Sequence, residues 1–284
     1  MHSVSGFTLC SLLYAIYRVR VCEIMKYIDI KKVKELPGRR LKPDDAFSFR
    51  CYPQIACFNH CCRNLNLFLY PYDVLRLKNA LDISSDQFLD RYVDVVLRPD
   101  NFFPQVLLRM SENDEKTCPF MHESGCAVYP DRPDTCRLFP MEQGILYDGA
   151  GEKDRVIYFF RPPDFCLGPS ENTRWTASRW AKDQQTEIYH RMTIRWAELK
   201  RLFQTDPWGA EGPQGPKAKM AFMAVYNLDR FREFVFNSSF LRRYKVKSEI
   251  LKKIKNDDKE LLKLAFDWIK FYLWGIKTKK FRPR

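Results

Sequence analysis

The stretch Cys118–Pro140, CPFMHESGCAVYPDRPDTCRLFP, decides how this chain folds, because it holds three cysteines in nineteen residues among Pro, Gly and Asp. These residue types form turns, and so short and interrupted a segment cannot build an apolar core of its own. Some further link must therefore hold its turns in place. Because thiolates bind metal ions strongly, the spacing of Cys118, Cys126 and Cys136 predicts a metal site.

Five more cysteines lie outside this stretch, four upstream and one downstream: Cys51, Cys57, Cys61, Cys62 and Cys166. Cys57 and Cys61 are four residues apart, so on a helical turn they share one face and can reach one metal ion. Cys62 is rotated by about 100° from Cys61 on a helix, which suits a second metal atom. We expect all eight cysteines to converge on one metal site, or on two sites close together.

Composition limits the classes of protein that fit. A chain of 284 residues with 45% hydrophobic residues can bury a substantial core, as one large domain or two small ones. The net charge of +13 is concentrated toward the end, since residues 241–284 hold fifteen Lys/Arg against five Asp/Glu. We expect this basic C-terminal region to bind an acidic protein or a nucleic acid.

Cysteine usage indicates a reducing compartment. Secreted disulfide scaffolds are usually short, whereas this chain is long and its ten cysteines are bunched. The apolar stretch at residues 6–17 is too short to span a bilayer, and it lacks the flanks of an export signal. We therefore expect a cytoplasmic protein with no membrane span. Residues 1–24 are interpreted as an upstream extension with Met25 as the start, and Cys10 and Cys22 lie outside the metal pattern.

Local patterns predict a mixed α+β fold. The expected elements are a helix beginning near Pro71, a second helix opened by the capping box Ser84–Gln87, and a hairpin formed by residues 144–147 and 155–160. Apolar and aromatic residues then recur at helical spacing in three segments, 175–203, 220–236 and 251–274.

These elements predict three parts. Residues 1–44 are an extension and linker, and residues 45–170 are an irregular cysteine-rich metal-binding module with short helices and antiparallel strands. Residues 171–284 are a mostly helical C-terminal region with a basic tail. A Pro/Gly-rich segment separates the first two C-terminal helices.

Zinc and iron–sulfur clusters both take cysteine thiolates in sets of four. Eight cysteines exceed one set, so two occupied sites, or one site with spare thiols, would fit. His60 and His122 are alternative ligands, and Arg63 and Arg137 would favour the thiolate form. The competing interpretation, buried and inert cysteines, explains an adjacent pair and two close triplets poorly.

A family resemblance rests on the pattern Cys57-x3-Cys61-Cys62-Arg63, then Cys118-Pro-Phe, then Arg132-Pro-x-x-Cys136-Arg-x-Phe-Pro, and Cys166-x-Gly168. Over about residues 47–170 the chain resembles the YkgJ-type cysteine-cluster family, which is described as zinc- or iron-chelating and includes relatives of flagellin lysine N-methylase. The usual first element of that family is C-x-x-C-G-x-C-C, from which the spacing around Cys51 departs. The resemblance implies a metal-binding fold.

The sequence favours a metal-binding protein with an iron–sulfur cluster, preferably [4Fe–4S], or zinc in the multi-cysteine site. The adjacent pair Cys61–Cys62 suits a polynuclear centre, because its two thiolates can reach different metal atoms. One alternative is an enzyme similar to a protein lysine N-methyltransferase, although no G-x-G-x-x-G loop follows a strand. Another is a structural zinc module that binds an acidic partner. Glu123 is a candidate base for a metal-bound water.

Overall fold

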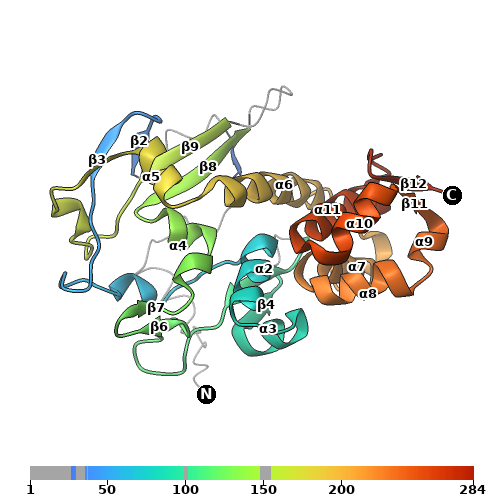
Figure 1. The fold of residues 1–284 in the computed structure, drawn as a ribbon, viewed down its shortest axis with the longest axis horizontal. Helices are drawn as coiled ribbons and strands as arrows, with labels where there is room; N and C mark the ends of the chain where they lie inside the picture. The colour runs from blue at the N-terminus through green and yellow to red at the C-terminus, as the bar shows by residue number, and fades with distance from the viewer. Residues whose placement is uncertain (1–26, 30–35, 37, 99–101, 148–154) are drawn as a thin grey trace, which may run out of the picture.

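The computed structural model describes residues 27–29, 36, 38–98, 102–147 and 155–284 (Figure 1). The predicted extension at residues 1–24, with Cys10 and Cys22, lies outside the described residues, as does Met25. The rest forms the predicted α+β fold, with short strands in small sheets and a helical C-terminal region. Among the described residues, no helix combines the length and apolar character needed to cross a lipid bilayer.

The largest sheet has four strands in the order β1-β8-β9-β2. Its centre is the predicted hairpin, formed by β8 (Met141–Tyr147) and antiparallel β9 (Arg155–Phe160). β1 (Tyr27–Asp29) adds to β8 in parallel, and β2 (Arg39–Leu41) adds to β9 antiparallel. The hairpin therefore delivers the end of β9 to Cys166.

Four further antiparallel pairs have two strands each, and three of them flank the cysteine-rich segments. The four pairs are β3 (Ala46–Ser48) with β10 (Arg174–Thr176), β4 (Val93–Val96) with β5 (Gln105–Leu108), β6 (Met121–His122) with β7 (Gly125–Cys126), and β11 (Tyr244–Val246) with β12 (Phe281–Pro283). The short 3₁₀ turns are η2 (His60–Cys62), η3 (Tyr129–Asp131), η4 (Gly168–Ser170) and η5 (Gly209–Glu211).

The first helices form where the sequence predicts them. α2 (Pro71–Ala80) begins with proline, and the Asp73 carboxylate accepts a hydrogen bond from the Tyr70 amide. α3 (Ser85–Tyr92) opens with the predicted capping box between Ser84 and Gln87. The short α4 (Asp134–Leu138) carries Cys136.

The three long C-terminal helices predicted from periodicity are each observed as two helices. The six are α5 (Ala177–Asp183), α6 (Glu187–Phe203), α7 (Pro216–Tyr226), α8 (Leu228–Asn237), α10 (Ser248–Asn256) and α11 (Asp258–Trp274), with the short α9 (Phe240–Arg243) between α8 and α10. Asn227 and Asp257 cause two of the breaks: each has a non-helical backbone and accepts hydrogen bonds from the first turn of the following helix. At the α5–α6 junction Gln185 has a positive φ of 53°.

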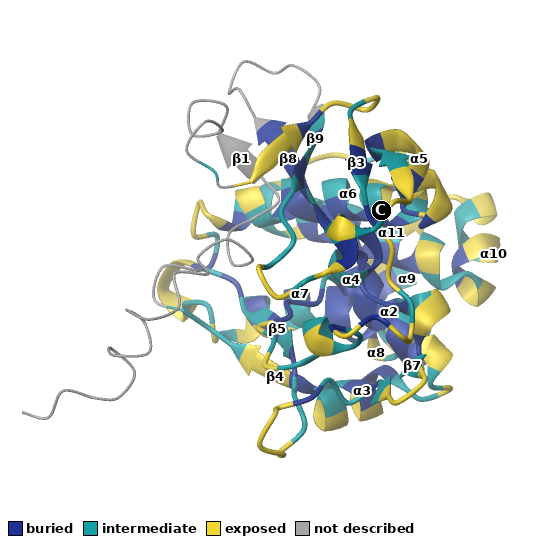
Figure 2. Ribbon diagram, turned by 90° about the vertical axis from the view of Figure 1, so that its left-hand side faces the viewer, coloured by how far each residue is buried: buried dark blue, intermediate teal, exposed yellow. Residues whose placement is uncertain are grey.

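One continuous apolar core joins the cysteine-rich part to the helical region. It includes Leu77 and Phe88 from α2 and α3, and Trp196, Phe231 and Trp268 from the C-terminal helices, all of them buried (Figure 2). Aromatic rings pack edge to face or stacked throughout this core. The predicted domain boundaries stay a prediction, but both sides of residue 170 contribute to the same apolar interior.

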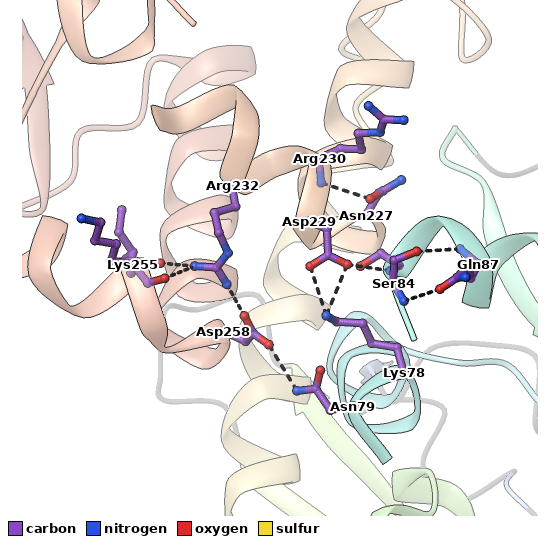
Figure 3. A network of polar contacts seen from close by, with 12 residues as sticks. Lys78, Asn79, Ser84, Gln87, Asn227, Asp229, Arg230, Arg232, Lys255 and Asp258 are labelled. Carbon is purple, nitrogen blue, oxygen red and sulfur yellow. Dashed lines mark hydrogen bonds and ion pairs between the residues drawn. The ribbon is translucent and has the colours of Figure 1, made fainter. Parts of the chain in front are cut away.

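A polar network fastens α2 and α3 to α8 beside this core (Figure 3). The ammonium of Lys78 contacts both carboxylate oxygens of Asp229, at 3.1 and 3.3 Å, and the Ser85 amide donates to the same carboxylate. Farther along, Arg232 pairs with Asp258, whose other oxygen accepts from Asn79. The network therefore connects the N-terminal helices to both α8 and α11.

Candidate metal centre

The first cysteines lie on an irregular loop between β3 and η2. Within it Asn59 takes a left-handed backbone (φ 61°), and its side-chain amide donates to the carbonyl of His122 at 2.9 Å. This bond joins the loop to the β6–β7 hairpin. The chain then turns through η2, where the sulfurs of Cys61 and Cys62 lie 4.0 Å apart.

Cys118 is held against Cys62 by the backbone. The Cys118 amide donates to the Cys62 carbonyl at 2.8 Å, and an isolated bridge joins Arg63 to Thr117. Cys126 follows on β7, whose tight hairpin with β6 needs the positive φ of Gly125 (129°). Two segments far apart in the sequence thus bring the backbones of Cys62 and Cys118 together.

Two buried arginines flank Cys136, which lies on α4. Arg137 donates to the Gln184 carbonyl at 2.8 Å and to the Tyr189 hydroxyl at 3.2 Å, and Arg132 binds the Gln184 side chain. These contacts explain why arginines stand at positions 132 and 137 of the Arg132-Pro-x-x-Cys136-Arg137 motif. Its two guanidinium groups lock α4 against the α5–α6 junction and bring positive charge near Cys136.

A carboxylate on α2 orients α4 from the other side. Asp73 accepts the Asp134 amide at 2.9 Å, while Thr193 on α6 donates to the Asp134 carboxylate at 3.1 Å. Both acidic residues are buried, at 2% and 0% exposure. The helix that carries Cys136 is therefore fixed by polar contacts to α2 and α6.

Cys166 lies in a turn after β9 and packs against the loop that carries Cys57. The Leu167 amide donates to the Cys57 sulfur at 3.2 Å, and the Arg50 amide donates to the Gly168 carbonyl at 3.1 Å. A Cβ at Gly168 would lie only 2.5 Å from the Phe49 ring. This close approach explains why glycine follows Cys166 in the motif.

The eight cysteines form two groups that meet at Cys61. The outer thiols are those of Cys51, Cys57 and Cys166. The inner thiols belong to Cys62, Cys118, Cys126 and Cys136, the last three of which pack against the main core. Cys61 lies close enough for its charge to raise the pKa values of members of both groups.

Proton affinities differ sharply between the adjacent cysteines. A hydrogen bond from the Cys62 thiol is the main cause that lowers the pKa of Cys61. The same bond, then burial, raises the pKa of Cys62. Burial is the largest cause that raises the pKa of Cys51 and of Cys118 to about 11 each. Cys61 is therefore the first of these thiols expected to ionise.

Three other cysteines share a backbone feature that favours thiolates. Burial raises the pKa of each of these thiols, but the amide two residues further along opposes it by hydrogen bonding to the sulfur. The three cysteine–amide pairs are Cys118 with Phe120, Cys126 with Val128, and Cys166 with Gly168. Such preset donors stabilise the deprotonated sulfur that a metal needs.

The donor set fits a thiolate-binding metal. All eight described cysteines are free thiols. As the side chains stand, no three His, Cys, Asp or Glu residues within the described part of the chain form a group that could hold one ion. Soft thiolates select zinc and iron–sulfur clusters, and the surrounding amides and guanidinium groups offset their negative charge.

The predicted alternative ligands lie at the edge of this region. His60 is exposed and packs edge-on to the Phe165 ring, with centroids 6.2 Å apart. His122 and Glu123 line an open cavity of about 620 Å³, together with Arg63 and Asn59. This cavity borders the loop that carries Cys57 and Cys61.

Sequence reasoning missed the residues that position the cysteines. Neither Asp73 nor Gln184 is singled out by the sequence patterns, which predict only a helix that begins near Pro71 and a helical segment over 175–203. Asp73 has a local contact with the Tyr70 amide at the start of α2, but its contact with the Asp134 amide is long-range and leaves no local signature. The Asp and Arg residues clustered around Cys136 are the one sequence feature that indicates polar contacts there.

The fold thus carries eight free cysteines in one part of an α+β protein. Residues 50–167 match the model of the CxxCxxCC family, described as a "Putative zinc- or iron-chelating domain". Over these residues the chain is similar to the cysteine-cluster family expected from the sequence. No curated protein and no solved structure matches the chain.

Proposed function

We propose that this protein holds two adjacent metal centres in its cysteine-cluster domain, with an iron–sulfur cluster, preferably [4Fe–4S], in at least one of them. Cys62, Cys118, Cys126 and Cys136 would ligate the inner centre. Cys61, with the three outer thiols, would ligate the second.

The observation that carries this proposal is the position of Cys61 between two groups of thiols. Each group reaches the four thiolates that a zinc ion or an iron–sulfur cluster takes, once Cys61 is counted with the outer thiols. The paired residues Cys61 and Cys62 then serve different centres. This division uses all eight cysteines and leaves no spare thiol.

The iron–sulfur assignment rests on the donors and their surroundings. The set is entirely thiolate. The backbone amides of Phe120, Val128 and Gly168 donate to the sulfurs of Cys118, Cys126 and Cys166, and such hydrogen bonds tune the potential of a cluster. Three of the four inner thiols, those of Cys118, Cys126 and Cys136, pack against the apolar core, which limits access of water to a cluster. Zinc is the alternative for either centre, and a cytoplasmic location follows from the reduced thiols that both metals need.

Purification without oxygen, followed by metal and sulfide analysis and a visible spectrum, tests the proposal. An iron–sulfur protein is brown and absorbs near 400 nm, whereas a zinc protein is colourless. Iron with matching acid-labile sulfide is the expected result. Bound zinc without sulfide would refute the iron–sulfur assignment but support a metal site. Absence of any bound metal would refute the metal site itself.

Variants separate two centres from one. Cys136→Ser should remove metal from the inner centre alone, and Cys166→Ser from the outer centre alone, so that each variant retains about half of the metal. Cys22→Ser is the matched control and should retain all of it. If Cys166→Ser loses nothing while Cys136→Ser loses everything, a single inner centre with spare thiols replaces the proposal.

A further inference from the structure

The β11–β12 pair forms a two-stranded ribbon whose two faces differ completely in character. Its register pairs Lys245 with Arg282, and Val246 with Phe281. Backbone hydrogen bonds extend the same register by one pair at each end. Arg284 donates to the Arg243 carbonyl at 2.9 Å, and Lys247 donates to the Lys280 carbonyl at 3.1 Å.

One face of the ribbon is apolar and packs onto α11. Val246 and Phe281 are buried, at 8% and 5% exposure. The rings of Tyr244 and Phe281 both pack edge-on against Phe271, with centroids 5.9 and 5.6 Å away. This anchoring fixes which residues point outward, because side chains alternate along a strand.

The other face carries only cations. Two cross-strand pairs lie along it, Arg243 with Arg284 and Lys245 with Arg282, and Lys247 continues the first row. Lys280, which lies opposite Lys247, is only 20% exposed and turns toward α11. Lys280 is neutralised by Asp267, at 2.8 Å. The other five cations are exposed, and none has an ion-pair partner among the described residues (Figure 1 shows the ribbon at one end of the molecule).

Such an arrangement works against stability, because like charges directly opposite on neighbouring strands repel. A fold that needed only solubility would interleave the two signs of charge. Along each strand, alternate residues on one face lie about 6.5–7 Å apart, and the strands are separated by about 4.8 Å. The cations therefore form two parallel rows of regular spacing.

We propose that the cationic face of the β11–β12 ribbon binds the phosphodiester backbone of a nucleic acid without sequence preference. Regularly spaced phosphates complement two regular rows of cations, and their release of counterions would drive binding. Amphipathic elements that lie in a membrane insert apolar side chains among the lipids, whereas the ribbon buries Val246 and Phe281 in the core. This site is independent of the metal centres.

Fluorescence anisotropy of the full chain with a labelled oligouridine of about 20 nucleotides tests this proposal. The double variant Lys245→Gln/Arg282→Gln should weaken binding several-fold at low salt. It should also reduce the slope of log K against log salt by about 1.4, since each single-strand phosphate contact contributes about 0.7. The control, Arg174→Gln/Lys182→Gln, removes two exposed cations from β10 and α5 and should change neither value.

Thermal unfolding of both variants keeps the result interpretable. Relief of repulsion should leave the melting temperature of the ribbon variant at or above that of the wild type, so weaker binding would not reflect misfolding. Equal losses in both double variants would overturn the proposal, since binding would then follow net charge alone. Equal competition by polyglutamate would also overturn it in favour of an acidic protein, and preferential binding to phosphatidylserine vesicles in favour of a membrane.

Discussion

Removal of the Asp229 carboxylate should destabilise the protein far more than removal of its partner Lys78. The Lys78 side chain is only 9% exposed, so Asp229→Ala leaves a buried ammonium and the Ser85 amide without their shared acceptor. An uncompensated buried charge costs about 3–5 kcal/mol. Because the Asp229 side chain is 35% exposed and water can enter its place, we expect a loss of about 2–4 kcal/mol.

Lys78→Met should cost less than about 1 kcal/mol, because Asp229 keeps the Ser85 amide and partial contact with water. The double variant Lys78→Met/Asp229→Ala should lose less than the sum of the two, by about 1–2 kcal/mol. Urea unfolding of the anaerobically purified chain, followed by tryptophan fluorescence, measures each free energy. The control is Glu187→Ala, which removes an exposed ion pair and should lose about 0.5 kcal/mol or less. A clearly larger loss in Asp229→Ala would support the role of the buried pair.

The pH dependence of stability offers a second test of the Lys78–Asp229 pair. Burial opposes ionisation of Asp229, but the Ser85 amide and Lys78 outweigh it, so the pKa of Asp229 is lowered. Its contribution is therefore present above the unfolded pKa, near 4, and is lost as pH falls through the lower folded value. The difference in free energy of unfolding between the wild type and Asp229→Ala should therefore become smaller in acid. At pH 7, a cost for Asp229→Ala no larger than that for Glu187→Ala would refute this reasoning.

Two further predictions concern Lys200 and Gly168. Burial lowers the pKa of Lys200 from 10.5 to about 8, so the unfolded chain binds more protons between these values and wild-type stability should rise with pH there. Lys200→Met should raise the free energy of unfolding at pH 7 by about 1–3 kcal/mol and abolish the rise of stability with pH. Urea unfolding at a series of pH values measures both effects. If the pH dependence of stability is unchanged in Lys200→Met, it does not come from Lys200. Gly168→Ala should press on the Phe49 ring, cost about 1–3 kcal/mol and release metal from the outer centre, whereas the exposed neighbour Ser170→Ala should retain it in metal analysis. Full metal retention by Gly168→Ala would count against the role of this turn.

Local sequence patterns predicted the elements that local interactions decide. The capping box at Ser84 and the hairpin before Cys166 depend on residues a few positions apart, and both form as expected. The helix breaks at Asn227 and Asp257 were missed because the apolar period continues across them. Whether such a residue caps a new helix or stays within one depends on what the next turn packs against.

The cysteines of the candidate site are a prediction from sequence, but their grouping could not be predicted. Cysteine spacing placed Cys57, Cys61 and Cys62 in one turn and predicted their involvement with the downstream cysteines. The pairing of the Cys118 amide with the Cys62 carbonyl, and of the Leu167 amide with the Cys57 sulfur, is long-range. No periodicity reports such contacts, so the division around Cys61 appears only once the chain is folded.

The shared apolar interior bears on how metal loading affects the whole molecule. Cys118, Cys126 and Cys136 pack against the same core that contains Trp196 and Trp268. A metal that binds only the folded form would therefore raise the melting point of the C-terminal helices as well as that of the cysteine loops. Starvation for that metal would weaken the entire chain at once, and the protein's abundance in a cell would follow its supply.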